Sequence, residues 1–130
     1  MLVNSGRDVI ADSIGKASGR PAVADQMAVT ANSTAPAAGD TTLTGEITTA
    51  GGGLVRGQAT YAHTTGASTY TLTKVFTANG SDTLPVTIAK IGIFNASSGG
   101  SLVFETLLSP TATLAASGDS VTITETITIS

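Results

Sequence analysis

The stretch VTIAKIGIFNASSGGSLVFETLL, residues 86–108, decides the fold class, because it reads as two apolar strands on either side of a soft turn. The turn NASSGG holds small polar residues and glycines, as hairpin loops do. Two strands joined by so short a loop pair antiparallel. The stretch ends on Phe104, Leu107 and Leu108. A sheet this apolar can have one of two roles. It can be a scaffold that supports a functional site, or its own surface can be the functional part of the protein.

The period of two continues on both sides of this hairpin. Met27 and Val29 share a face in ADQMAVT, and alternation recurs in the segments 54–63, 68–77 and 120–129. Turn signals separate them, and Pro110 with ASGD at 116–119 is expected to close the last connection. The sequence therefore predicts five to seven strands in a mainly β chain. We expect an antiparallel β-sandwich, jelly-roll-like or Ig-like, with one short N-terminal helix in a single domain, residues 1–130.

The helix is predicted over residues 5–14, SGRDVIADSI. Ser5 is a good N-cap, and Asp8 follows three residues later as in a capping box. Apolar side chains at Val9, Ile10 and Ile14 lie close to one helical face. This face is expected to cover the sheet; the alternative is that it docks on a partner. Residues 1–22 thus form an N-terminal helix and arm.

A long loop is predicted at residues 31–53. Pro36, Gly39 and many small polar residues argue against a packed element, and AGGG at 50–53 is a flexible break. Long loops in compact domains are often functional. With the N-terminal segment, this loop is expected to reach a neighbouring molecule.

Composition narrows the possible partners. Charged residues make up 12% of the chain, about half the usual share, and the six Lys and Arg residues form no basic patch. Binding to nucleic acid through phosphate contacts is therefore not expected. No apolar run reaches membrane-spanning length, so no membrane partner is expected. Sparse charge is typical of a surface buried against other subunits, which favours a homo-oligomer.

One carboxylate stands out in the final strand. Glu125 shares its predicted face with Val121, Ile123, Ile127 and Ile129. Because an isolated buried carboxylate is costly, Glu125 is expected to form a buried ion pair, with Lys74, Lys90 or Arg56. The alternative is an edge strand whose inward charge blocks wrong pairing.

Few residues suit catalysis. His63 is the only histidine, there is no cysteine, and no Gly-x-Ser-x-Gly elbow is present. A lone histidine beside a turn is usually structural, and one imidazole cannot make a triad or a zinc site alone. Asp40 and Asp119 lie in loops without calcium-binding spacing, and are expected to make local backbone hydrogen bonds. The sequence thus predicts a non-enzymatic protein with no catalytic residues, no metal and no cofactor.

Three segments in order, NSGRDVIADSIG, TAPAAGDTTLTGEI and TIAKIGIFNASSGGSLVFETLL, precede a Thr-rich final strand. This pattern resembles small bacteriophage virion proteins, in particular the tail-collar or tail-fibre-like family and related capsid decoration proteins. The likeness spans nearly the whole chain, and each motif alone is weak. The residues that carry it are Asn4, Gly6, Arg7, Asp40, Thr41, Leu43, Glu46, Ile88, Ile91, Gly92, Phe94 and Leu102.

The resemblance implies a structural protein without an active site, made in the bacterial cytoplasm and located on the phage particle. Because the chain stops after its last strand, with no fibre shaft, we expect a capsid decoration or cement protein that binds the head and stabilises it. The implied partners are the major capsid protein or tail proteins of the same virion, and further copies of the chain, with a trimer favoured. A tail component (collar, adaptor or fibre-like protein) is the alternative, and a carbohydrate-binding host-attachment module a more remote one.

Overall fold

The structure, a computed structural model, describes all residues from Met1 to Ser130 and contains one helix and seven strands. In chain order the elements are α1 (Asn4–Gly15), β1 (Gln26–Thr30), β2 (Gly57–Gln58), β3 (Thr60–His63), β4 (Thr69–Thr77), β5 (Val86–Phe94), β6 (Leu102–Leu114) and β7 (Ser120–Thr128). No helix has the length and apolar character needed to cross a membrane.

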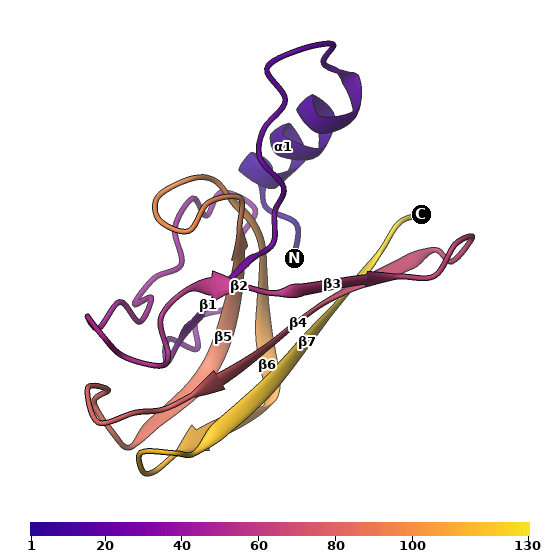
Figure 1. Cartoon of the computed structure of the whole chain (residues 1–130). Helices are drawn as coiled ribbons and strands as arrows, with labels where there is room; N and C mark the ends of the chain where they lie inside the picture. Colours follow the sequence, from indigo (N-terminus) through magenta and orange to yellow (C-terminus); the bar gives the residue numbers. More distant parts are fainter.

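The strands form two antiparallel sheets, which confirms the predicted mainly β fold and is consistent with a β-sandwich. The four-stranded sheet has the order β2-β1-β5-β6 and the three-stranded sheet the order β3-β4-β7. Figure 1 shows that the strands of the two sheets run in clearly different directions, so the ends of β3, β4 and β7 project past the other sheet. Between the sheets lies the inner core, which includes Met27, Val29, Leu72, Phe76, Ile88, Ile91, Ile93 and Ile123.

The four-stranded sheet also has a second buried face. Here the outer cluster, defined by Val3, Ala28, Leu43, Phe94 and Leu102, packs against the N-terminal segment and the long loop. Strand β5 is therefore buried on both faces, which explains its nearly continuous apolar sequence. A register shift between Ile88 and Lys90 lets Ile88 and Ile91 both face the inner core, and it turns Lys90 to the outer face.

Two strand predictions are corrected. The segment 54–63 is not one alternating strand: it divides into β2 and β3, which belong to different sheets, and Ala59 between them is buried. The chain also does not end its strand at Pro110, because β6 continues to Leu114. A proline is tolerated there because β6 is an edge strand and because Pro110 lies in the register shift between Leu107 and Ala112, where it has no partner on β5.

The helix is one residue longer at each end than predicted, and its N-cap differs. Val3 precedes α1 and provides no side-chain cap. Ser5 is not the cap; its hydroxyl instead donates to the Leu102 carbonyl at 2.6 Å and so attaches the helix to β6. Only Gly6 is fully buried in α1, and a Cβ there would clash with the Val103 carbonyl oxygen. The helix therefore touches the sheet through its first turn, and its apolar face does not cover the sheet as expected.

The long loop contains no regular strand, as predicted, yet it is packed. Leu43 is buried in the outer cluster, and the Ile47 amide donates to the Val29 carbonyl at 3.0 Å. The Thr30 hydroxyl lies 2.8 Å from the Thr44 carbonyl and 2.9 Å from that of Gly45. The sequence-based view that this loop lacks internal structure is thus wrong, because residues 31–47 cover the outer face of the four-stranded sheet. That the loop reaches a neighbouring molecule stays a prediction.

Candidate functional site

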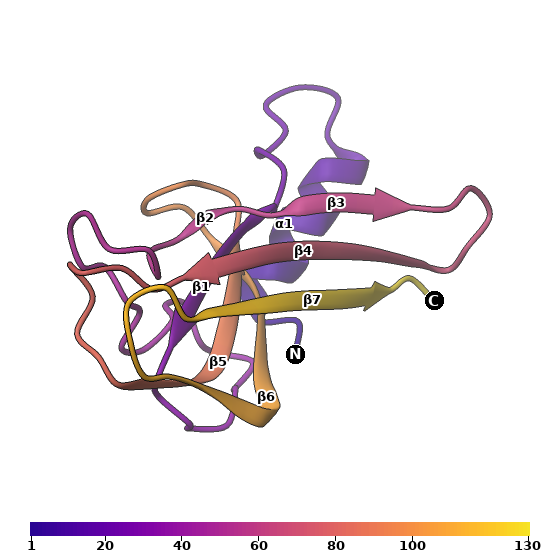
Figure 2. The same ribbon diagram turned by 60° about the horizontal axis from the view of Figure 1, so that its bottom comes forward.

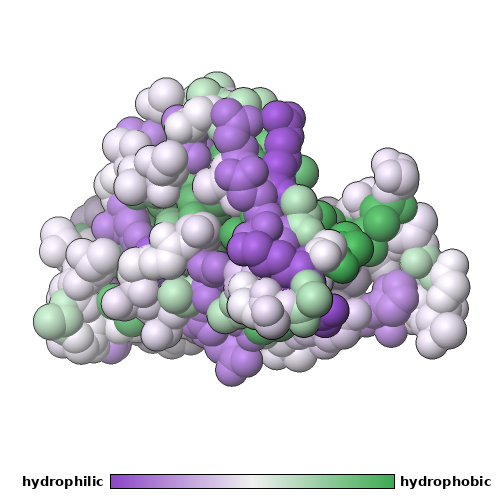
Figure 3. Space-filling model, turned by 90° about the horizontal axis from the view of Figure 1, so that it is seen from above, coloured by the Kyte–Doolittle hydropathy of each residue, from purple (hydrophilic) through white to green (hydrophobic).

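An apolar groove of about 880 Å³ lies between α1 and the projecting ends of the three-stranded sheet. We call it the α1 groove. Five of the eight exposed large hydrophobic residues line it: Ile10, Ile14, Val23, Tyr61 and Ile129. Seen from above in Figure 3, hydrophobic surface gathers beside a hydrophilic ridge, on the side of the projecting arm. The exposed apolar surface of the protein is therefore concentrated in one place.

The groove arises from the way the two sheets cross. Leu72 lies beneath the four-stranded sheet and is 1% exposed. Further along the same three-stranded sheet, Tyr61 and Ile129 lie beyond that cover and are 61% and 62% exposed. Because α1 is attached only through its first turn, its second half stands over these strand ends, and Ile14 is 80% exposed.

The α1 groove contains two tyrosines and almost no charged side chains, and these features determine what it can bind. The rings of Tyr61 and Tyr70 lie 5.7 Å apart at 45°. Burial raises the pKa of Tyr70, with smaller contributions from Tyr61 and Glu125, so its hydroxyl remains protonated at neutral pH. Asp25 is the only charged side chain in the lining, and it accepts hydrogen bonds from Gln26 and Gln58. The groove thus suits an uncharged, largely apolar protein surface.

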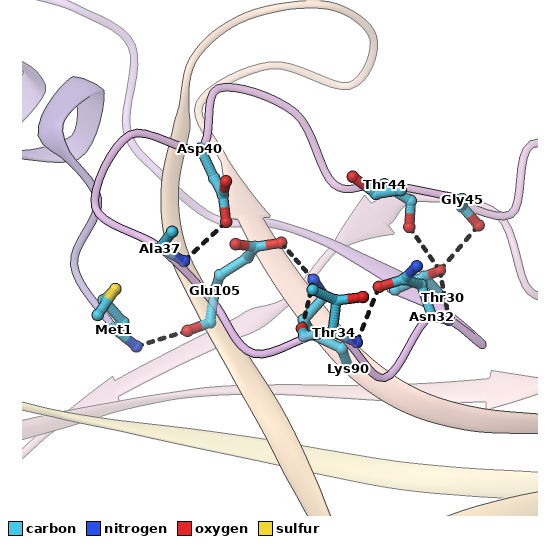
Figure 4. A network of polar contacts seen from close by, with 10 residues as sticks. All are labelled: Met1, Thr30, Asn32, Thr34, Ala37, Asp40, Thr44, Gly45, Lys90 and Glu105. Carbon is cyan, nitrogen blue, oxygen red and sulfur yellow. Dashed lines mark hydrogen bonds and ion pairs between the residues drawn. The ribbon is translucent and has the colours of Figure 1, made fainter.

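A buried ion pair lies on the opposite side of the four-stranded sheet, beneath the long loop. Lys90 Nζ is 2.9 Å from Glu105 Oε1, and the two side chains are 2% and 1% exposed. Lys90 also donates to the Thr34 carbonyl of the loop at 3.1 Å. In Figure 4 the carboxylates of Asp40 and Glu105 point toward one another. The loop thus supplies one carbonyl and one further carboxylate to a buried charge cluster.

The two carboxylates of this cluster have opposite pKa shifts. Burial raises the pKa of Glu105, and neighbouring Asp40 raises it further, while Lys90 lowers it. No aligned hydrogen-bond donor faces either Glu105 oxygen, so only the ion pair offsets desolvation of its charge. Asp40 has a lowered pKa, mainly because its carboxylate accepts from the Ala37 amide at 2.8 Å. This arrangement fixes the loop in place.

A second ion pair binds the long loop at Glu46. Arg56 binds Glu46 through two hydrogen bonds of 2.7 and 2.8 Å, and it lies 3.6 Å above the Phe94 ring. It also donates to the carbonyls of Ala96 and Gly99 in the β5–β6 turn. The largely buried guanidinium of Arg56 thereby joins the long loop to the β5–β6 hairpin.

Most residues of the predicted family motif meet around the outer cluster. Leu43, Phe94 and Leu102 belong to it, and a Cβ on Gly92 would lie 3.1–3.3 Å from these three side chains. The first turn of α1 joins them: the Asn4 amide donates to the loop carbonyl of Ala38, and Arg7 donates to Asn4. Asp40 and Glu46 belong to the two ion-pair networks already described. Ile88 and Ile91 face the inner core instead, and Thr41 is exposed.

Glu125 does not form the expected ion pair. Its carboxylate accepts from the Thr106 hydroxyl at 2.8 Å, and none of the three ion pairs includes it. The physical reason is that Arg56 binds Glu46, Lys90 binds Glu105, and Lys74 lies over the Phe76 ring. Strand β7 is an edge strand, which agrees with the second reading of this residue.

The remaining polar residues have local partners. His63 lies exposed at the end of β3, with Nδ1 2.9 Å from the Thr69 carbonyl. Asp119 accepts from the amides of Ala115 and Ala116, as loop aspartates were expected to do. No group of three or more His, Asp and Glu side chains is placed to hold a metal ion.

Sequence reasoning missed the Lys90–Glu105 pair, although a signal was present. Each residue is a single charge inside an otherwise apolar strand, and the two strands form one hairpin. The observed register places Gly92 opposite Glu105 and Lys90 opposite Leu107, so the two charges are diagonal neighbours on one face. Two opposite charges at such positions in a doubly buried hairpin indicate an ion pair.

The structure thus defines an antiparallel β protein with a polar network on one side and an open apolar groove on the other. A scan against models of known protein families gave no match, and a search of curated protein sequences found none similar.

Proposed function

We propose that the protein is a non-enzymatic structural component of a bacteriophage particle, a decoration protein that binds the outer surface of the head through the α1 groove. The observation that carries the proposal is the concentration of exposed apolar side chains in that one groove. The order of the sequence motifs, which resembles phage virion proteins, supports the choice of particle.

The proposed partner is the major capsid protein. The groove lining contains one charged side chain, Asp25, and two tyrosines, a composition suited to the apolar centre of a protein interface. Two polar groups of the long loop, the Thr34 carbonyl and the Glu46 carboxylate, are by contrast bound within the molecule by Lys90 and Arg56. The loop therefore serves as part of the scaffold, and binding falls to the helix side.

The experiment is co-sedimentation with particles of the encoding phage that lack this protein. We expect saturable binding of the unchanged protein and at least a tenfold loss for Ile14→Asp, because a charge is placed in the groove. Val75→Asp is the matched control: Val75 is 53% exposed but does not line the groove. Absence of binding, or equal loss in both variants, would contradict the proposal.

Electron microscopy of decorated particles then gives the location. Density on the head surface is the expected result. Density on the tail would contradict the decoration role and favour the alternative, a collar, adaptor or fibre-like tail component.

A further inference from the structure

The four edges of the two sheets are protected very differently. Strand β2 has two residues and β3 has four, so both present little free backbone. Strand β6 is covered at its start by the N-terminal segment, where Leu2 bridges to Phe104 and the Val3 amide donates to Val103; further along it contains Pro110. Short strands, covering segments and prolines are ways in which proteins block edge pairing. Strand β7 has none of these, and its one protective feature is the inward charge of Glu125.

Strand β7 leaves one side of its backbone without partners. It pairs with β4 over nine residues without a register break. The Ile129 amide donates to the carbonyl of Ser68, the residue before β4, and the Asp119 carbonyl accepts from the amide of Ala78, the residue after β4. Because backbone direction alternates along a strand, odd-numbered residues face β4 and even-numbered residues face the free edge. The backbone groups on this edge belong to Ser120, Thr122, Thr124, Thr126 and Thr128, all exposed.

From this edge we propose that two copies of the chain associate through antiparallel pairing of their β7 strands, with the two-fold axis at Thr124. The occupant is a second copy because β7 is complementary to itself in this register. Thr124 meets Thr124 of the second copy, Thr122 meets Thr126, and Ser120 meets Thr128. All five edge-facing residues then find partners, for about ten interstrand hydrogen bonds.

Glu125 selects this register. A two-fold at residue 125 would set the two Glu125 carboxylates directly opposite each other, which is destabilising. With the two-fold at Thr124, Glu125 lies opposite Ile123 of the second copy, and Ile127 lies opposite Val121. The inward carboxylate of Glu125, which accepts a hydrogen bond from the Thr106 hydroxyl at 2.8 Å, thus limits the registers in which the edge of β7 can pair.

Symmetry also fixes how the two copies are arranged. Figure 2 shows β7 as the outermost strand of its sheet, so pairing there joins two three-stranded sheets into one of six. An antiparallel two-fold stands perpendicular to the sheet and uses both free edges, so the contact closes as a dimer and does not continue into a filament. Both α1 grooves then open on the same side of the joined sheet. This association does not depend on the proposed role in a phage particle.

The test is the molar mass of the purified protein, by light scattering across a concentration series. A contact made chiefly by strand edges is expected to have a Kd in the micromolar range. Thr124→Pro removes the central edge N–H and should give a monomer, with circular dichroism to check the fold. A monomer or trimer at high micromolar concentration, or a dimer that persists in folded Thr124→Pro, would overturn the proposal.

A matched pair of double variants tests the register without relying on proline. Thr122→Lys with Thr126→Glu places opposite charges across the interface, whereas Thr122→Lys with Thr126→Lys places like charges there. Both pairs change only exposed side chains of one strand. We expect the first variant to dimerise about tenfold more tightly than the second. Equal affinities would contradict the register centred on Thr124.

Discussion

Two segments lie against the four-stranded sheet, the loop at 31–53 and helix α1. How closely each packs on the sheet is the opposite of what its composition suggests. The loop is polar and rich in small residues, yet it encloses the Lys90–Glu105 ion pair and buries Leu43. The helix has an apolar face, yet Ile14 is 80% exposed. The difference teaches that backbone hydrogen bonds and one well-placed apolar side chain bind a segment to a sheet, while an apolar stripe alone does not.

The largest expected effect comes from breaking the ion pair beneath the loop. Lys90→Met leaves the Glu105 carboxylate buried and unpaired, and should lower the free energy of unfolding by about 3–5 kcal/mol at pH 7. Denaturant unfolding measures this. Adding Glu105→Leu to Lys90→Met should restore most of the loss, because no buried charge remains. A single variant as stable as the unchanged protein would show that the loop does not enclose the pair.

The attachment of α1 should be the next most sensitive feature. Gly6→Ala introduces a Cβ against the Val103 carbonyl, so the helix must move. We expect a loss of about 1–3 kcal/mol in the free energy of unfolding. Gly15→Ala, at a helix position with nothing within 4 Å, is the control and should have no such effect. Equal stability of the two variants would contradict the close contact.

The pH dependence of stability should separate the two carboxylates beneath the loop. Because the pKa of Glu105 is raised, its contribution to stability is complete below the usual 4.5 and is lost as pH rises through the raised value. The pKa of Asp40 is lowered, so its contribution is present above 3.8 and is lost as pH falls through the lowered value. Urea unfolding across pH should therefore show that Glu105→Gln removes the decline above 4.5. A decline that persists unchanged in this variant would assign it to another group.

The smallest effect on stability is expected in the α1 groove. Ile14→Asp changes a largely exposed side chain, so the free energy of unfolding should change by no more than about 0.5 kcal/mol. Thermal unfolding of Ile14→Asp, compared with that of Val75→Asp, checks this. If both variants stay folded, a loss of particle binding in Ile14→Asp reflects the changed surface of the groove. A strongly destabilised Ile14→Asp would mean that the helix face is part of the core.

Periodicity was sufficient to predict the strands and their pairing in the hairpin 86–108. It failed where a segment changes sheets, as at Ala59, because one continuous alternation cannot show which sheet each half joins. The family-motif residues were named by resemblance, and the structure explains Gly92, Phe94 and Leu102 by packing in the outer cluster.

Two features of the site could not be read from the chain alone. The α1 groove depends on how far the three-stranded sheet projects past its neighbour, a property of the crossing of the sheets. The partners of Arg56 and Lys90 depend on the path of the long loop, which brings Glu46 and Thr34 to them. Local sequence carries no signal for that path, since the loop residues have no periodicity.

Amide hydrogen exchange on the free protein tests most directly whether the polar loop belongs to the folded scaffold. The amides of Glu46 and Ile47 donate to Leu43 and Val29. We predict that they exchange as slowly as those of β1, while the exposed turn at 64–67 exchanges fast. Exchange of Glu46 and Ile47 at the rate of that turn would contradict the account.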